Sequence, residues 1–238
     1  LALPHAAAAL GLAFLIAPSG WIARALSPWA TGWTEPPDLH ILNDPMGLAL
    51  TAGLVAKEVP FLLLMALSVL PQTDGARRGQ VAATLGYGRS MGFAISTLPA
   101  VYRGLRLPAF AVLAYGMTNV DMAMILGPGL PPPLAVQITR WMTDPSLAHL
   151  PTAAAAALVQ LGLVAGVLAL WLLAERLLGP ALPALAMTGL RGRALDRPLA
   201  VLARSAALVI AAGLGAGMAG LLLWPVAGLW QFPDAMPA

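Results

Sequence analysis

Five long apolar runs constrain this chain more than any other feature of its sequence. Hydrophobic residues make up 59% of its 238 residues and charged residues only 10%, whereas about 25% of a soluble domain is charged. A helix needs about 20 residues to cross a hydrocarbon core about 30 Å thick. In lipid the backbone must satisfy its own hydrogen bonds, which favours helices. The sequence therefore predicts an all-α protein embedded in a lipid bilayer, with spans near residues 1–17, 46–71, 107–126, 152–174 and 204–223.

Small residues in two of these runs predict close packing between helices. Both runs are rich in alanine, and the spacing of Gly162 and Gly166 recurs at Gly213 and Gly217. Residues without large side chains let helix backbones approach closely in a membrane. We expect these four glycines to serve packing of the bundle.

The sequence lacks the residue sets on which several kinds of chemistry depend. It contains no cysteine, which excludes disulfides and thiolate metal sites. Its scattered basic residues form no dense stripe with aromatic residues between them, which argues against binding to nucleic acid. His5, His40 and His149 lack metal-ligand spacing, and no serine has a convincing base beside it. We expect no metal site, no cofactor and no catalysis in this chain, with His5 near the inner end of the first span.

Arginine is distributed unevenly between alternate connections. The connections 18–45 and 127–151 hold one arginine each, Arg24 and Arg140. The connections 72–106 and 175–203, together with the adjoining Arg204, hold ten: Arg77, Arg78, Arg89, Arg103, Arg106, Arg176, Arg191, Arg193, Arg197 and Arg204. Because basic connections stay in the cytoplasm, 72–106 and 175–203 are predicted to be cytoplasmic, as is the opening stretch.

The stretch QVAATLGYGRSMGFAISTLP, residues 80–99, is an amphiphilic insert within the first of these cytoplasmic connections. Its first six residues, Gln80–Leu85, favour helix. Gly86 and Gly88 provide a hinge, because glycine adopts a positive φ at little cost. A second short helix is expected from Arg89 to Thr97, with Pro99 ending it. From the residues alone, a rigid protruding knob and an ordinary connecting loop are both compatible with this pattern.

This insert resembles the EAA loop of ABC importer permeases. The pattern of that loop is Glu-Ala-Ala, three residues, Gly, and a hydrophobic-x-Leu-Pro ending thirteen residues after the glycine. Ala82, Gly86 and Leu98-Pro99 fit it, whereas Gln80 replaces the glutamate and Val81 the first alanine. These two departures keep the helix but remove a charge, so a salt bridge made by that glutamate elsewhere in the family does not carry over.

The resemblance implies a type I ABC importer transmembrane-domain helical bundle with cytoplasmic coupling helices, in a bacterial inner membrane. In that family the loop docks into a separate ATPase subunit, which binds the ATP, and this chain contains no GxxxxGK[ST] phosphate loop. An extracytoplasmic solute-binding protein and a second permease half are the other implied partners. The residues implied to couple to the ATPase are Gln80, Ala82, Ala83, Gly86, Gly88, Arg89, Leu98 and Pro99.

The resemblance covers about residues 1–178, which match one permease half. Three further stretches within these residues resemble sequences common in the family: the pair Pro60-Phe61, LRLPAFAVLAYG and LGPG. Some permeases of the ferric-iron, sulfate, molybdate and thiamine type fuse two halves in one chain. Residues 179–203 then correspond to a cytoplasmic linker and 204–238 to the first span of a second half. Because the chain begins with leucine inside an apolar run, we expect it to be a fragment whose first half is partial at its N-terminus.

Polar residues within the apolar runs are costly and therefore candidates for function. Lys57 and Glu58 lie in the middle of the second run, just before Pro60. Adjacent helical residues point about 100° apart, so we expect these two not to pair face to face. Either they line a translocation path, or they form ion pairs with other helices.

The third run carries its own polar set, Tyr115, Thr118, Asn119 and Asp121. At helical spacing, Tyr115, Thr118 and Asn119 share a face with Met122, and Asp121 lies beside it. Both cavity lining and hydrogen bonding between helices are compatible with this arrangement.

Two other functions are compatible with a polytopic membrane chain. An ion- or proton-coupled secondary transporter would use Lys57, Glu58 and Asp121 as a relay, and inverted repeats would mark it. A membrane enzyme would need a cluster of His and Asp or of Ser and His, which the sequence does not show. The sequence does not identify the solute, for which thiamine, ferric iron, an oxyanion and a polyamine all stay open.

Overall fold

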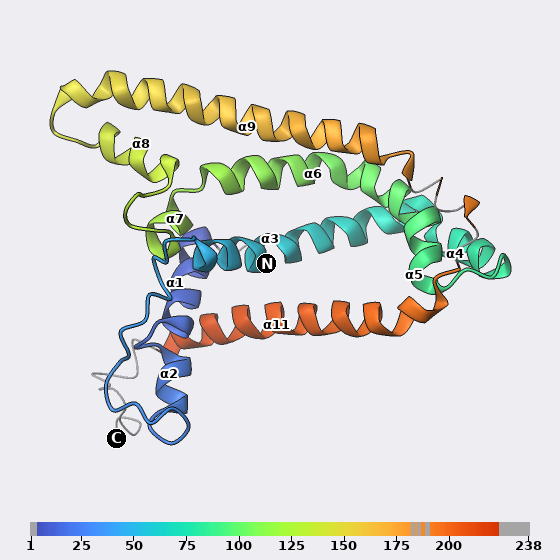
Figure 1. The fold of residues 1–238 in the computed structure, drawn as a ribbon, viewed down its shortest axis with the longest axis horizontal. Helices are drawn as coiled ribbons and strands as arrows, with labels where there is room; N and C mark the ends of the chain where they lie inside the picture. Colours follow the sequence, from blue (N-terminus) through green and yellow to red (C-terminus); the bar gives the residue numbers. More distant parts are fainter. Residues whose placement is uncertain (1–3, 182–183, 185–186, 189–190, 224–238) are drawn as a thin grey trace. The chain divides into compact units, whose positions relative to one another are not determined.

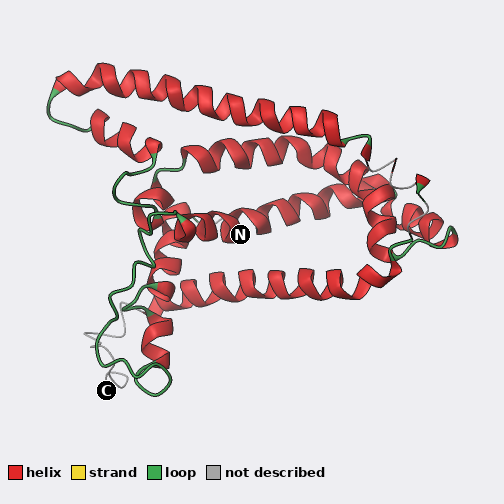
Figure 2. Ribbon diagram, viewed as in Figure 1, coloured by secondary structure: helices red, strands yellow, loops and turns green. Residues whose placement is uncertain are grey.

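The described part of the chain consists of helices joined by loops and contains no strand (Figures 1 and 2). This computed structural model describes residues 4–181, 184, 187–188 and 191–223. The chain divides into two compact units, each built from separate segments. Unit 1 comprises residues 1–58, 118–158 and 209–238, and unit 2 comprises 59–117 and 159–208.

Four helical segments among the described residues are long and apolar enough to cross a membrane: His5–Leu26, Leu48–Thr73, Leu147–Leu178 and Asp196–Leu222. They contain α1 (His5–Ile16) with α2 (Trp21–Leu26), α3 (Leu48–Val69) with the 3-10 turn η1 (Leu70–Thr73), α9 (Leu150–Leu178) after the turn η3 (Leu147–His149), and α11 (Asp196–Leu223). Four of the five expected spans are therefore present. The α11 helix begins inside residues 179–203, which the sequence indicated as linker, because the turn η4 (Arg193–Leu195) leads directly into it.

The third apolar run, residues 107–126, is not one helix. Instead α6 (Leu98–Thr118) begins nine residues before the run and ends within it, and α7 (Asp121–Leu126) follows after a break. The break lies at Asn119, whose side-chain Oδ1 accepts a hydrogen bond of 2.8 Å from the backbone N–H of Met122. Asparagine competes in this way for backbone donors and so favours helix starts over helix interiors.

The core of unit 1 is built on small side chains. Ala9, Ala13 and Ala49 are buried together with Met122 and Leu126 of α7. Because alanine adds little bulk, α1 approaches α7 closely enough to bury these two larger side chains completely. The unit also contains α8 (Leu134–Met142), which begins after Pro133.

Asp44 fixes the start of α3 at the edge of this core. Its carboxylate accepts hydrogen bonds from the backbone N–H groups of Leu48 at 2.7 Å and Ala49 at 2.9 Å. Such bonds satisfy amides that have no partner inside the helix. The amides of Ala49 and Leu48 therefore hold the pKa of Asp44 below its usual value.

One of the four predicted packing glycines makes a close backbone contact. A Cβ built on Gly217 of α11 would lie 2.9 Å from the backbone carbon and oxygen of Gly11 in α1. Gly213 has no described atom within 4 Å of such a Cβ, and neither has Gly162 or Gly166. The spacing therefore identified the contact at Gly217, but not its partner on α1.

Replacing Gly217 by isoleucine should destabilise the protein, because the new side chain meets backbone that cannot rotate away. The expected loss is about 1–3 kcal/mol, the usual cost of overpacking. The matched change Gly215→Ile, at an exposed position of the same helix with nothing within 4 Å of a Cβ, should cost much less. Thermal unfolding in detergent compares the two variants, and equal losses would contradict the close contact of α1 and α11.

Candidate functional site

The amphiphilic insert folds as two short helices joined by a sharp turn in unit 2. Helix α4 (Gly75–Thr84) ends before Gly86, and α5 (Arg89–Gly92) begins three residues after it. Gly86 has a φ of +84°, in the left-handed region that glycine adopts without strain. The N–H of Gly86 donates to the carbonyl of Ala83 at 2.9 Å, and that of Tyr87 to Ala82 at 3.0 Å. These two bonds form a Schellman cap, which ends a helix at a left-handed residue.

Ala82 and Gly92 bring the two short helices into contact. Ala82 is 5% exposed, and a Cβ built on Gly92 would lie 3.0 Å from the Cβ of Ala82. A larger residue at either position would push α4 and α5 apart. The small residue expected in the EAA pattern at position 82 therefore has a packing role here.

Gly88 is needed for a different reason from the one the sequence suggested. Its φ is −65°, which any residue can adopt, so it contributes no positive φ to the hinge. A Cβ at Gly88, however, would lie 2.9 Å from the Cα of Arg193 and 2.7 Å from the Oδ2 of Asp196. Gly88 thus permits residues 193–196 to lie directly against the turn.

Pro99 does not end the second helix, contrary to the prediction. After α5 the chain widens into the π-helical turn η2 (Phe93–Thr97) and continues without a break into α6. Pro99 is the second residue of α6, and proline is tolerated in the first turn of a helix. A single π-helical turn inside a longer helix also relaxes its regular hydrogen bonding. The insert is therefore continuous with the long helix α6.

The residues implied to couple to an ATPase divide into two groups. Ala82 and Gly88 are buried and, with Gly86, give the turn its shape, while Gln80, Ala83 and Arg89 are exposed. Leu98 is 37% exposed, and Pro99 is partly exposed. A groove of about 920 Å³ runs along this surface, and its lining includes Gln80, Ala83, Tyr87, Arg89 and Phe93.

The uneven distribution of arginine coincides with the division into units. Unit 2 contains all ten arginines of the predicted cytoplasmic connections, and unit 1 contains the remaining three basic residues, Arg24, Lys57 and Arg140. The insert therefore belongs to the arginine-rich unit.

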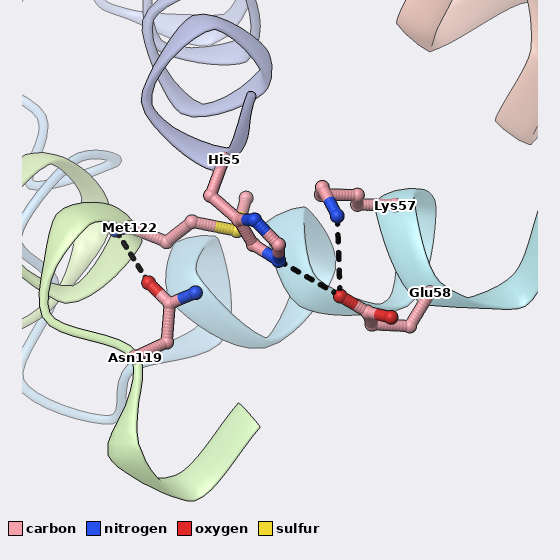
Figure 3. Close-up of polar contacts among 5 residues, drawn as sticks. All are labelled: His5, Lys57, Glu58, Asn119 and Met122. Atoms are coloured by element: carbon pink, nitrogen blue, oxygen red, sulfur yellow. Dashed lines mark hydrogen bonds and ion pairs between the residues drawn. The ribbon is translucent and has the colours of Figure 1, made fainter. Parts of the chain in front are cut away.

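A second polar site lies within unit 1 and joins α1 to α3 (Figure 3). The Nε2 atom of His5 lies 3.0 Å from the Oε1 atom of Glu58, and the Nζ atom of Lys57 lies 3.5 Å from the same oxygen. The three side chains are partly buried, with 17% of His5, 17% of Lys57 and 13% of Glu58 exposed. We call this set the His5–Lys57–Glu58 cluster.

One expectation about this cluster is wrong. Lys57 and Glu58 do meet, because the long lysine side chain spans the angle between adjacent helical positions. His5 is the first residue of α1 and so lies at the end of its candidate span, and its side chain contacts Glu58 in the middle of α3. A histidine inside an apolar run, with a carboxylate inside the next one, was the available sequence signal for this pair.

The polar residues of the third run do not share one helical face, because the helix ends among them. Tyr115 and Thr118 belong to α6 and are exposed, while Asp121 begins α7 and is also exposed. Asn119 lies between the two helices, is 6% exposed and caps α7. Its observed bond is a local backbone cap.

A further polar network links α6 to α9 in unit 2 and was not foreseen from the sequence. The hydroxyl of Tyr102 donates to the Oε1 of Glu175, and the indole N–H of Trp171 donates to Tyr102 at 2.7 Å. The Nε of Arg106 lies 2.9 Å from the Oε2 of Glu175. The only indication in the sequence that Glu175 forms an ion pair was the large number of arginines in this unit.

A double-mutant cycle tests the His5–Lys57–Glu58 cluster. Glu58→Gln removes the counter-charge of Lys57, and Lys57→Gln leaves Glu58 charged, so each single change should destabilise the protein. The double change removes both charges and should cost less than the sum of the two single changes. We expect a coupling of about 0.5–3 kcal/mol, as for contacting residues, measured by denaturant unfolding in detergent. Simple additivity would show that the contact contributes nothing.

Comparison with known proteins gives a likeness to a membrane permease. The chain is 35% identical over 144 residues to the inner membrane ABC transporter permease protein YnjC of Escherichia coli strain K12. The match covers 60% of this chain but only 26% of that protein, so the chain spans about a quarter of the relative. No protein-family model matches the chain, and no solved structure matches it at a significant level. The likeness is therefore to part of a membrane permease, and the four membrane-length helices agree with a membrane-embedded chain.

Proposed function

We propose that this chain forms part of the permease subunit of a type I ABC importer and couples to a separate ATPase through residues 80–99. The turn between α4 and α5 is the observation that carries the proposal. It combines the left-handed Gly86, the Ala82–Gly92 contact and an exposed groove, in the unit that contains most of the arginine. The likeness to an ABC transporter permease independently supports the permease part of this proposal.

A rigid knob of this kind is suited to passing on an external movement. The insert runs through η2 into α6 without interruption, so a displacement of α4 and α5 moves α6 with it. ATP binding and hydrolysis in the partner would close the ATPase subunits and shift these helices as a rigid body. The chain itself performs no catalysis in this account and holds no cofactor.

The solute would pass between this permease half and a second one, in the same polypeptide or in another. A solute-binding protein would deliver it to the outer connections, which lie in unit 1. The residues proposed for the path are Lys57, Glu58, Tyr115, Thr118, Asn119 and Asp121. Tyr115, Thr118 and Asp121 are exposed in the structure, which leaves them accessible to a solute or to the second half.

The rival relay of a secondary transporter gains no support from the geometry. Within the described part of the chain, no hydrogen bond or ion pair joins the Asp121 carboxylate to Lys57 or Glu58. Asn119, two residues before Asp121, accepts a hydrogen bond from the backbone N–H of Met122.

Co-purification of the tagged permease with its co-expressed ATPase subunit tests the proposal. Gly86→Val should weaken this association by about tenfold or more, because a side chain in the left-handed region costs roughly 1–2 kcal/mol per residue and reshapes the turn. Gly129→Val is the matched control, since Gly129 has open space around it and lies in an outer connection. Failure of the wild type to bind the ATPase, or undiminished binding by Gly86→Val, would refute the proposal.

A further inference from the structure

Residues 191–196 lie against the turn of the insert, although they are about a hundred positions away in the sequence. The N–H of Gly88 donates to the carbonyl of Arg191 at 2.7 Å. The next two amides, of Arg89 and Ser90, donate to the Oδ2 and Oδ1 of Asp196 at 2.8 and 2.7 Å. Three consecutive amides of the turn are therefore bound by one distant segment.

These bonds replace partners that α5 cannot supply for itself. The first amides of any helix lack a carbonyl within it, and α5 has only four residues. A carboxylate that accepts from two such amides forms charge-assisted hydrogen bonds, which are stronger than neutral ones. Asp196 thus fixes the beginning of α5, and it is also the first residue of α11.

The carbonyls on the other side of the turn are held by the same segment. Arg191 donates from its guanidinium to the carbonyl of Leu85, and the Nε of Arg193 donates to that of Gly86 at 3.0 Å. The guanidinium of Arg191 also lies over the ring of Tyr87, 4.8 Å from its centre. Residues 191–196 therefore bind both N–H groups and carbonyl groups of the turn. Bonds on both sides fix the orientation of the turn as well as its position.

Glycines on both sides make this approach possible. Gly192 has a φ of +63°, and a Cβ there would lie 2.8 Å from the Cβ of Met91. Gly88 is equally constrained by the backbone of Arg193. Each surface is therefore shaped to fit the other.

We propose that residues 191–196 form an intrachain clamp that holds the coupling loop in its docking shape and ties it to α11. Asp196, Arg191 and Arg193 are its positioning residues, and the inference rests on the coupling function proposed above. The clamp gives the loop a second mechanical connection. A movement of α4 and α5 reaches α6 through η2 and reaches α11 through Asp196.

Hydrogen exchange on the purified full chain, without ATPase, tests the clamp itself. Asp196→Asn keeps the size of the side chain but replaces one carboxylate oxygen by an NH₂ group. That group cannot accept a hydrogen bond from the N–H of Arg89 or Ser90 that it faces. The amides of Arg89 and Ser90 should then exchange at least tenfold faster. Asp74→Asn is the matched control, because no hydrogen bond of the Asp74 side chain occurs among the described residues. Unchanged exchange at Arg89 and Ser90 in Asp196→Asn would overturn the proposal.

Gly192→Val is a second variant that tests the clamp if Asp196→Asn does not fold. Its side chain would collide with Met91 and distort the clamp, so the amides of Arg89 and Ser90 should again exchange faster. Exchange within α9 should stay as in the wild type, which would show that the fold is intact. Slow exchange at Arg89 and Ser90 in this variant would also count against the clamp.

Binding to the ATPase subunit then tests the positioning role. The apparent dissociation constant rises as the fraction of correctly shaped loop falls, so Asp196→Asn should weaken binding by roughly tenfold. Gly129→Val, in an outer connection with open space around it, should not share this loss. Faster exchange with unchanged binding would refute the positioning role. Absence of ATPase binding by the wild type would instead refute the proposed function, and the exchange result would still decide whether the clamp exists.

Discussion

The left-handed turn at Gly86 gives the insert of residues 80–99 its shape. Its positive φ ends α4 and redirects the chain into α5, and a Schellman cap secures the change of direction. Ala82 and Gly92 allow the two helices to touch. Without this turn the stretch would be an ordinary connection, and the surface that includes Gln80, Ala83 and Arg89 would have no defined shape.

Features that depend on local residue chemistry could be predicted from the sequence. The positive φ of Gly86 follows from the conformational freedom of glycine, and the four membrane-length helices follow from uninterrupted apolar runs. The break at Asn119 was missed because hydropathy alone does not register a side chain that caps the next helix. The end predicted at Pro99 was wrong because a π-helical turn precedes it and the proline lies in the first turn of α6.

Features that depend on distant contacts could not be predicted from the sequence. Asp196 gives no local sign that it binds amides more than a hundred residues away. His5 and Glu58 belong to separate apolar runs, and only the fold brings them to 3.0 Å. Likewise, Gly217 was identified as a packing residue, but its partner Gly11 was not. In each case the residue type was informative, whereas the partner was set by the tertiary structure.

Coupling to an ATPase requires residues 80–99 to lie on the cytoplasmic side of the membrane. The chain contains no cysteine, so Gln80→Cys introduces one exposed thiol on α4. A membrane-impermeant maleimide should label it in inside-out vesicles but not in intact cells, and the bound ATPase subunit should protect it. Labelling from outside the cell, or no protection by the ATPase, would contradict the account.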